Sequence, residues 1–285
     1  MPENRSASSS TGAAHAVGTA HTIHAGDTVD GGSYVDVDGN LMWHFCGGDP
    51  AGAPTVLLHG AFASAATWGA QIAGLSDAGL RLHVPELTGH GHSPDVDADW
   101  SMEAMTAQTI AYLESVVGRP AHLVGWSDGA VRALLVARAR PDLVSRVVLM
   151  CHYMNSDGRA AAGFFDRLAA RDPALVEFLR EGYQAESPDR PDHFDEIYRK
   201  SEALLRDGPE YPLAEFATVT APTLVLAADR GVVRLEHSLA LARTLPNGRF
   251  AVLPGTHILP IEAPDLVNPL VSSFLAAEPP REWSP

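Results

Sequence analysis

The chain has 285 residues, enough for one large domain or two small ones, and 46% of them are hydrophobic, which is ordinary for a globular protein. Twenty Lys and Arg residues against 35 Asp and Glu residues give a net charge of −15, which disfavours binding to nucleic acid and to anionic membranes. We find no run of 18 apolar residues and no apolar segment near the start, so we expect no transmembrane helix, no secretory signal and a cytoplasmic location. Cys46 and Cys151 lie far apart in apolar runs and are interpreted as buried free thiols.

Short apolar runs alternate with helical patterns along most of the chain. Residues 1–30 are rich in Ser, Ala, Gly and Thr and are predicted to form a disordered tail. Next, 33–37 and 41–46 flank Asp38-Gly39-Asn40, which predicts a β-hairpin. Six further strands are predicted at 55–58, 80–84, 121–125, 144–151, 223–228 and 249–253, and four long helices at 101–117, 129–140, 235–245 and 264–276.

This alternation predicts a mostly parallel sheet of about eight strands with helices on both faces. Residues 154–215 break the rhythm, because they hold several amphipathic pieces and no strand pattern. The interval is too long for a simple connection between a helix and a strand. We therefore expect a core domain over 31–153 and 216–285, with 154–215 forming a helical cap over one end of the sheet.

The sharpest local motif is Gly125-Trp126-Ser127-Asp128-Gly129, a G-x-S-x-G sequence that follows a predicted strand and opens a predicted helix. Such a tight turn needs glycine on both sides and lifts the serine hydroxyl clear of the backbone at a helix N-terminus. The motif predicts that Ser127 is a catalytic nucleophile.

A serine nucleophile needs a base and an oxyanion hole. His257 lies in Pro254-Gly255-Thr256-His257, directly after the last predicted strand, where an enzyme with this turn places its base. The backbone amide of Asp128, after the nucleophile, and that of Ala61, after His59-Gly60, are the expected oxyanion donors.

With these motifs the chain resembles the α/β-hydrolase fold superfamily over about residues 33–277. The resemblance is carried by His59-Gly60, the stretch Gly89-His90-Gly91-His92-Ser93, the Ser127 motif and Gly255-Thr256-His257. It is similar in style to small capped bacterial serine hydrolases such as esterases, lactonases and hydrolases of carbon–carbon bonds. In the family, the stretch at 89–93 is a structural loop, so its histidines need not bind metal.

One departure from the family concerns the acid that orients the histidine. The resemblance implies an acid at position 231, after the seventh strand of the family, but that residue is Gly231. The alternatives are Asp229, two residues earlier and otherwise a turn-capping residue, Asp157 with Asn155 as a neutral substitute, and no carboxylate at all. Of these residues, Asp229 is the preferred candidate.

The sequence thus predicts a cofactor-independent serine hydrolase that cleaves an ester, a lactone or a similarly activated carbonyl of a small hydrophobic molecule. The alternative is a non-hydrolytic member of the same fold, either a cyclase or lyase or a small-molecule binding protein, because position 231 is glycine. No cluster with metal-ligand spacing and no phosphate-binding loop stands out, so neither a metal nor a nucleotide cofactor is expected. The expected partner is a small-molecule substrate, and the oligomeric state stays open, a homo-oligomer included. Residues expected to line an apolar substrate pocket are Phe62, Trp126, Tyr153, Phe165, Tyr198 and Ile258.

Overall fold

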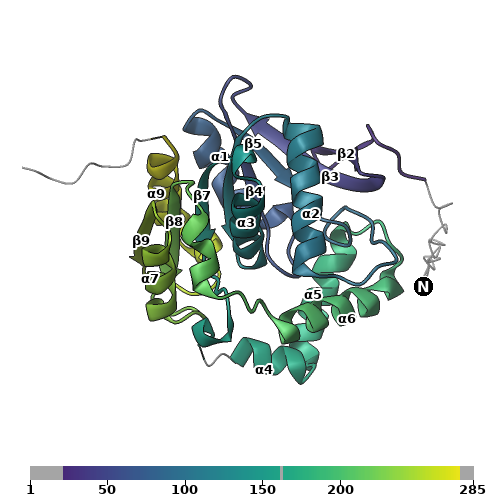
Figure 1. Ribbon diagram of the computed structural model, residues 1–285. Helices are drawn as coiled ribbons and strands as arrows, with labels where there is room; N and C mark the ends of the chain where they lie inside the picture. Colours follow the sequence, from purple (N-terminus) through teal and green to yellow (C-terminus); the bar gives the residue numbers. More distant parts are fainter. Residues whose placement is uncertain (1–21, 161–162, 277–285) are drawn as a thin grey trace, which may run out of the picture.

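A nine-stranded sheet forms the centre of the protein in a computed structural model that describes residues 22–160 and 163–276 (Figure 1). Its strand order is β1-β2-β3-β5-β4-β6-β7-β8-β9, antiparallel from β1 to β5 and parallel from β5 onward. The strands are β1 Thr28–Val29, β2 Gly32–Val37, β3 Asn40–Gly48, β4 Ala53–Leu58, β5 Leu80–Pro85, β6 Ala121–Trp126, β7 Val144–Met150, β8 Thr223–Ala228 and β9 Gly248–Leu253. The predicted, mostly parallel sheet is confirmed.

The amino-terminal hairpin turns at Asp38 and Gly39, which have positive φ angles of 51° and 80°. A two-residue turn with φ > 0 at both positions matches the right-handed twist of its strands, and it pairs Val37 with Asn40. The predicted hairpin is present, but Asn40 belongs to β3 and not to the turn. The structure differs from the expectation at one point. Residues 28–29 lie within the predicted tail but pair with β2 as strand β1, which makes nine strands rather than eight. Residues 26 and 27 of the predicted tail also exchange backbone hydrogen bonds with Tyr34, whereas residues 1–21 lie outside the described residues.

Helices cover both faces of the sheet. Against one face, α2, α3 and α7 bury a core that includes Val56, Leu123 and Leu134, and against the other, α1 and α9 bury Leu57, Val124 and Val271. The bounds are α1 Gly69–Asp77, α2 Met102–Tyr112, α3 Asp128–Ala139, α7 Leu235–Thr244, α8 Leu259–Glu262 and α9 Pro264–Ala276. Shorter turns are the 3₁₀ segments η1 Ala65–Trp68, η3 Pro141–Leu143, η4 Ser156–Gly158, η5 Pro191–His193 and η6 Leu213–Thr218, and the π-helical η2 Leu113–Val117, which continues α2.

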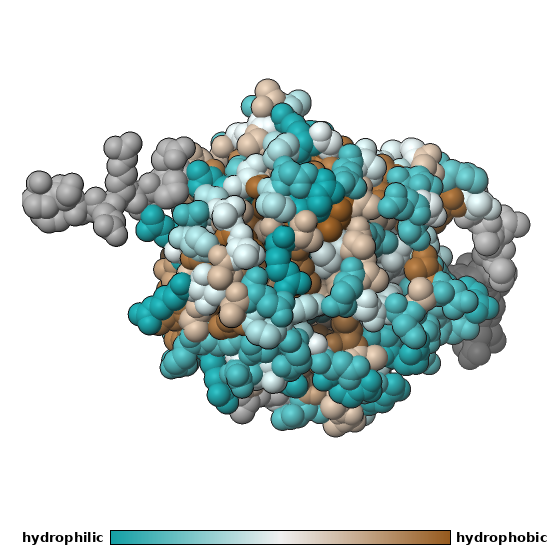
Figure 2. All heavy atoms as spheres, viewed as in Figure 1, coloured by the Kyte–Doolittle hydropathy of each residue, from teal (hydrophilic) through white to brown (hydrophobic). Residues whose placement is uncertain are grey.

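Three further helices lie between β7 and β8 in the chain, and we call α4 Gly163–Ala169, α5 Pro173–Glu186 and α6 Phe194–Asp207 the inserted helices. They lie together below the sheet in the view of Figure 1. Helix α6 is amphipathic: Phe194, Ile197 and Tyr198 are buried, whereas its other side is charged. The outward side of α5 and α6 is largely hydrophilic in Figure 2. Among the described residues, no helix is long and apolar enough to span a membrane.

Candidate active site

Ser127 occupies a strained turn between β6 and α3. Its φ and ψ are 55° and −128°, a conformation that non-glycine residues seldom adopt and that is held here by the packing of the turn. A Cβ on Gly125 would come within 2.2 Å of the Gly129 carbonyl oxygen, and one on Gly129 within 2.0 Å of the Leu58 carbonyl oxygen. Both glycines of the motif are therefore required by the close approach of backbone to backbone, and the turn predicted from the sequence is present.

The structure brings Ser127 and His257 together, although 130 residues separate them. Nε2 of His257 lies 3.1 Å from Oγ of Ser127, within hydrogen-bonding distance. The loop after β9 carries His257 to this position, and the Trp126 indole fixes the loop by donating a 2.7 Å hydrogen bond to the His257 carbonyl oxygen. Burial, aided by the nearby charge of His152, lowers the pKa of His257 to about 4, so that its imidazole is neutral at pH 7.

The second ring nitrogen of His257 has no acid beside it. Nδ1 of His257 is buried and has no hydrogen-bond partner in the described part of the chain. Asp229, the expected partner, instead accepts a 2.8 Å hydrogen bond from the Gly255 amide through Oδ1. This departs from the expectation of an Asp229–His257 pair, because the Asp229 side chain is used to cap the turn that precedes His257.

The remaining acid candidates do not fill the position either. Asp157 lies in η4 and does not bind His257, whose Nδ1 has no partner among the described residues. The Asn155 side chain donates a 3.0 Å hydrogen bond to the Tyr211 carbonyl oxygen. Among the alternatives raised by the sequence, the described residues therefore support a serine–histidine pair without a carboxylate.

The loop after β4 packs directly against Ser127. A Cβ on Gly60 would lie 2.8 Å from Cβ of Ser127, so glycine lets the loop approach the nucleophile. Ala61 follows, and no acceptor for its amide lies among the described residues. Asp128 is the first residue of α3, so its amide also lacks a helical acceptor one turn back. Both amides are thus free to donate to a ligand within the described part of the chain, and they stay the predicted oxyanion donors.

A buried contact between Asp128 and His152 lies beside Ser127 and was not predicted from the sequence. Asp128 accepts a 2.9 Å hydrogen bond from Nε2 of His152, the second residue after β7. Burial alone would raise the pKa of Asp128, but the hydrogen bond and charge of His152, with the nearby charge of Arg132, lower it overall. A cavity of about 20 Å³, room for a single water, adjoins this pair. In the sequence, the one indication was that His152 comes directly after a predicted strand. That strand, β7, pairs with β6, which ends just before Ser127.

The six side chains expected to line a substrate pocket differ in their surroundings. Trp126 and Tyr153 are buried next to the site, Trp126 against His257 and Tyr153 against His152 and Phe165. Phe62 lies between the oxyanion loop and the inserted helices, with its ring 5.6 Å from that of Tyr198. Tyr198 is buried and donates a hydrogen bond to the Leu168 carbonyl oxygen, so it packs within the inserted helices. Ile258 is 44% exposed.

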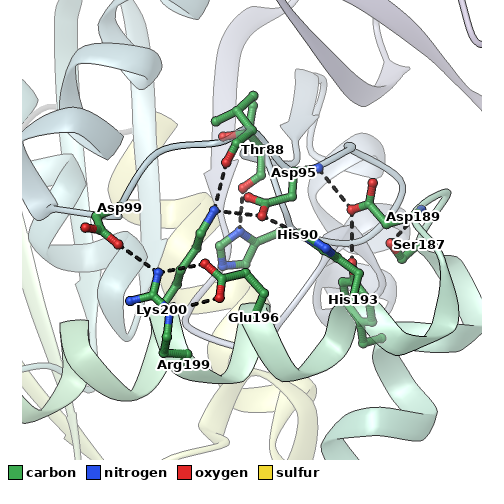
Figure 3. A network of polar contacts seen from close by, with 12 residues as sticks. Thr88, His90, Asp95, Asp99, Ser187, Asp189, His193, Glu196, Arg199 and Lys200 are labelled. Carbon is green, nitrogen blue, oxygen red and sulfur yellow. Dashed lines mark hydrogen bonds and ion pairs between the residues drawn. The ribbon is translucent and has the colours of Figure 1, made fainter.

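The inserted helices are attached to the core by a buried charge cluster, shown in Figure 3. Asp95, in the loop after β5, accepts hydrogen bonds of 2.7 Å from Nζ of Lys200 and 2.8 Å from Nε2 of His193. The Asp95 amide donates to Asp189, which extends the cluster to the end of α5. Lys200 and Asp95 have only 3% of their side-chain surface exposed, so the pair gives these helices one defined position over the core.

Comparison with known proteins agrees with this geometry. The model of the alpha/beta hydrolase family matches residues 55–270. A pimeloyl-[acyl-carrier protein] methyl ester esterase of Methylococcus capsulatus is 43% identical over 100 residues, 35% of this chain and 37% of that protein. A protein of Variovorax paradoxus, whose name marks it as a presumed carbamate hydrolase, is 30% identical over 80% of this chain and 93% of its own length.

Solved structures show the same fold. The 2-hydroxy-6-oxo-6-phenylhexa-2,4-dienoate hydrolase of Rhodococcus sp. strain RHA1 superposes with a TM-score of 0.72 at 20% identity, covering 86% of this chain and 98% of that one. The sheet topology, the turn at Ser127 and the family match over residues 55–270 lead to one conclusion. The chain belongs to the alpha/beta hydrolase family.

Proposed function

We propose that the protein is a serine hydrolase that cleaves an ester, a lactone or a similarly activated carbonyl of a small hydrophobic molecule. The observation that carries the proposal is the 3.1 Å contact between Nε2 of His257 and Oγ of Ser127 at a strained strand-to-helix turn. The methyl ester esterase of Methylococcus capsulatus supports the ester class, although its match covers 37% of its length.

In this proposal, neutral His257 removes the proton of Ser127 as the hydroxyl oxygen attacks the substrate carbonyl carbon. The carbonyl oxygen becomes negatively charged and is held by the amides of Ala61 and Asp128. Protonated His257 then gives the proton to the leaving group, which leaves Ser127 acylated. Water, deprotonated by His257, releases the acid and restores the enzyme.

The lack of an acid beside His257 narrows the substrate class. An imidazole whose pKa is lowered to about 4 is a weak base, so it activates Ser127 less than an imidazole paired with a carboxylate. The same imidazole, once protonated, is a strong acid and transfers its proton readily to a leaving group. These properties suit carbonyls that are already reactive, such as strained lactones and esters of acidic alcohols, better than amides.

The inserted helices serve as the cap in this proposal. Phe165 of α4 contacts Tyr153, which stands beside the Asp128–His152 pair, and Phe62 bridges the oxyanion loop to α6. Aromatic rings from both parts of the chain thus border the site. Such a border favours an uncharged, apolar group on the substrate.

The test compares hydrolysis of p-nitrophenyl esters by the protein with hydrolysis by Ser127→Ala, by His257→Ala and by the double variant. Because the two residues act as one unit, each single variant should lose several orders of magnitude and the double variant no more than either. Near-full activity of Ser127→Ala would refute the nucleophile, and losses that multiply in the double variant would refute His257 as its base. Circular dichroism spectra of all three variants serve as the folding control.

One observation favours a second candidate function. The unpartnered Nδ1 of His257 also fits a member of the family that binds or rearranges a small molecule without forming an acyl intermediate. For that protein, ester hydrolysis would be negligible from the start and would not change in Ser127→Ala.

A further inference from the structure

A second cluster of chemically reactive side chains lies on the sheet away from Ser127. His44 and Cys46 stand two residues apart on β3 and therefore point to the same face, and His83 of β5 is paired directly with Cys46. Sγ of Cys46 lies 3.6 Å from Nδ1 of His44 and 3.5 Å from Nδ1 of His83. We propose that His44, Cys46 and His83 form a binding site for a thiophilic divalent cation of the Zn²⁺ type.

The distances from the Cys46 sulfur to the two imidazole nitrogens fit a zinc site. Zn²⁺ in proteins has Zn–S distances of about 2.3 Å and Zn–N distances of about 2.0–2.1 Å, which hold S and N ligands about 3.6 Å apart in a tetrahedron. The two S–N separations, 3.5 Å and 3.6 Å, match that value. The three ligand atoms all lie within 4.8 Å of one another. One thiolate and two imidazoles are also ligand types that select zinc over calcium or magnesium.

Tyr112 supplies a fourth group at the same point. Its hydroxyl oxygen lies 2.6 Å from Nδ1 of His44, and it comes from the last residue of α2, just before the π-helical η2. A cation held by Nδ1 of His44 would replace that hydrogen bond, and the phenol oxygen would then be in reach of the same ion. Three elements, β3, β5 and α2, would be joined there.

The protonation states are favourable for the two imidazoles. Burial, together with the charge of Arg81, lowers the pKa of His44 and brings that of His83 to about 4, so both rings are neutral at pH 7 and keep a lone pair for a metal. Burial raises the pKa of Cys46, so its thiol loses a proton to solvent as the S–Zn bond forms. The charge of Arg81 opposes a bare cation and should weaken its binding at this site.

The site is separate from the proposed catalytic centre. His83 pairs with Val56 of β4, which pairs with Leu123 of β6, four residues before Ser127. Its two histidines are buried and Cys46 is half-buried, so an ion can reach it from the surface. This site could not be predicted from the sequence, because the third ligand, His83, follows Cys46 by 37 residues and comes from another strand.

Cobalt(II) tests the proposal, because it replaces Zn²⁺ and its bond to thiolate absorbs strongly in the near ultraviolet. The full chain, stripped with chelator, should bind about one equivalent of Co²⁺ with this absorption, and added Zn²⁺ should bleach it. Cys46→Ser should abolish the near-ultraviolet band, and His83→Gln should weaken Co²⁺ binding at least tenfold. Cys151→Ser, which removes the other thiol at the end of β7, is the matched control and should keep the band.

Two results would overturn the proposal: no near-ultraviolet band in the unaltered protein, or a band that persists in Cys46→Ser. Exposed histidines elsewhere in the chain that take up Co²⁺ do not produce a thiolate band, so they do not confuse the result. A second measurement covers a Cys46→Ser variant that fails to fold. In the unaltered protein, Zn²⁺ should slow alkylation of Cys46 at least tenfold and chelator should reverse this, whereas an unchanged rate would refute the site.

Discussion

Gly231→Asp should convert the serine–histidine pair into a complete triad and so raise ester hydrolysis. The fold has room for the change, because a Cβ at position 231 meets nothing closer than 3.5 Å and Gly231 has no positive φ. Position 231 comes shortly after the end of β8, where the family resemblance places the acid. A triad carboxylate is worth up to about 10⁴-fold in turnover, about 5 kcal/mol, which sets the ceiling for the gain. We expect at least a tenfold increase in kcat/KM.

The pH dependence of kcat/KM tests the same substitution independently. A carboxylate near His257 favours the charged imidazolium, so the pKa of His257 should rise from about 4 and the acidic limb of kcat/KM should move to higher pH. Gly231→Asn has a side chain of the same size without the charge and should leave the limb where it is. If Gly231→Asp changes neither rate nor limb while Asp229→Ala abolishes hydrolysis, then Asp229 already serves His257 and the reasoning is refuted.

Three further outcomes are expected. Since His257 must be neutral to act as a base, kcat/KM of the unaltered protein should fall only as the pH drops through about 4; a limb near the ordinary histidine pKa would contradict this. Lys200→Met leaves the Asp95 carboxylate buried with His193 as its remaining side-chain partner. This variant should therefore lower the free energy of unfolding, measured in urea, by about 3–5 kcal/mol. A loss below about 1 kcal/mol would show that the pair is not structurally important. Phe165→Ala should change the ratio of rates on long and short acyl esters more than the rate on the short ester, and an unchanged ratio would remove α4 from the substrate pocket.

The sequence predicted those parts of the protein that depend on local patterns. The apolar run at 223–228 coincides with β8, and the proposed cap Ser101 accepts a hydrogen bond from the Ala104 amide at the start of α2. The turn at Ser127 was predictable because neighbouring backbone atoms exclude a side chain at positions 125 and 129, so both positions are glycine in the sequence.

The missing parts depend on contacts between distant segments. Whether Asp229 binds His257 or the Gly255 amide depends on the conformation of one loop, and no sequence pattern encodes that difference. The buried Lys200–Asp95 pair joins residues 105 positions apart, so nothing in the sequence connects the two charged residues. Strand β1 is two residues long and too short to show any periodicity.

Labelling with a fluorophosphonate, followed by mass spectrometry of the peptides, tests the central claim most directly. The reagent phosphonylates a serine only when a neighbouring base removes its proton, so it reports on Ser127 and His257 together without knowledge of the substrate. We predict that the peptide containing Ser127 gains the label stoichiometrically and that His257→Ala loses it. No labelling of that peptide, or equal labelling in His257→Ala, would contradict the assignment of the site as a serine hydrolase.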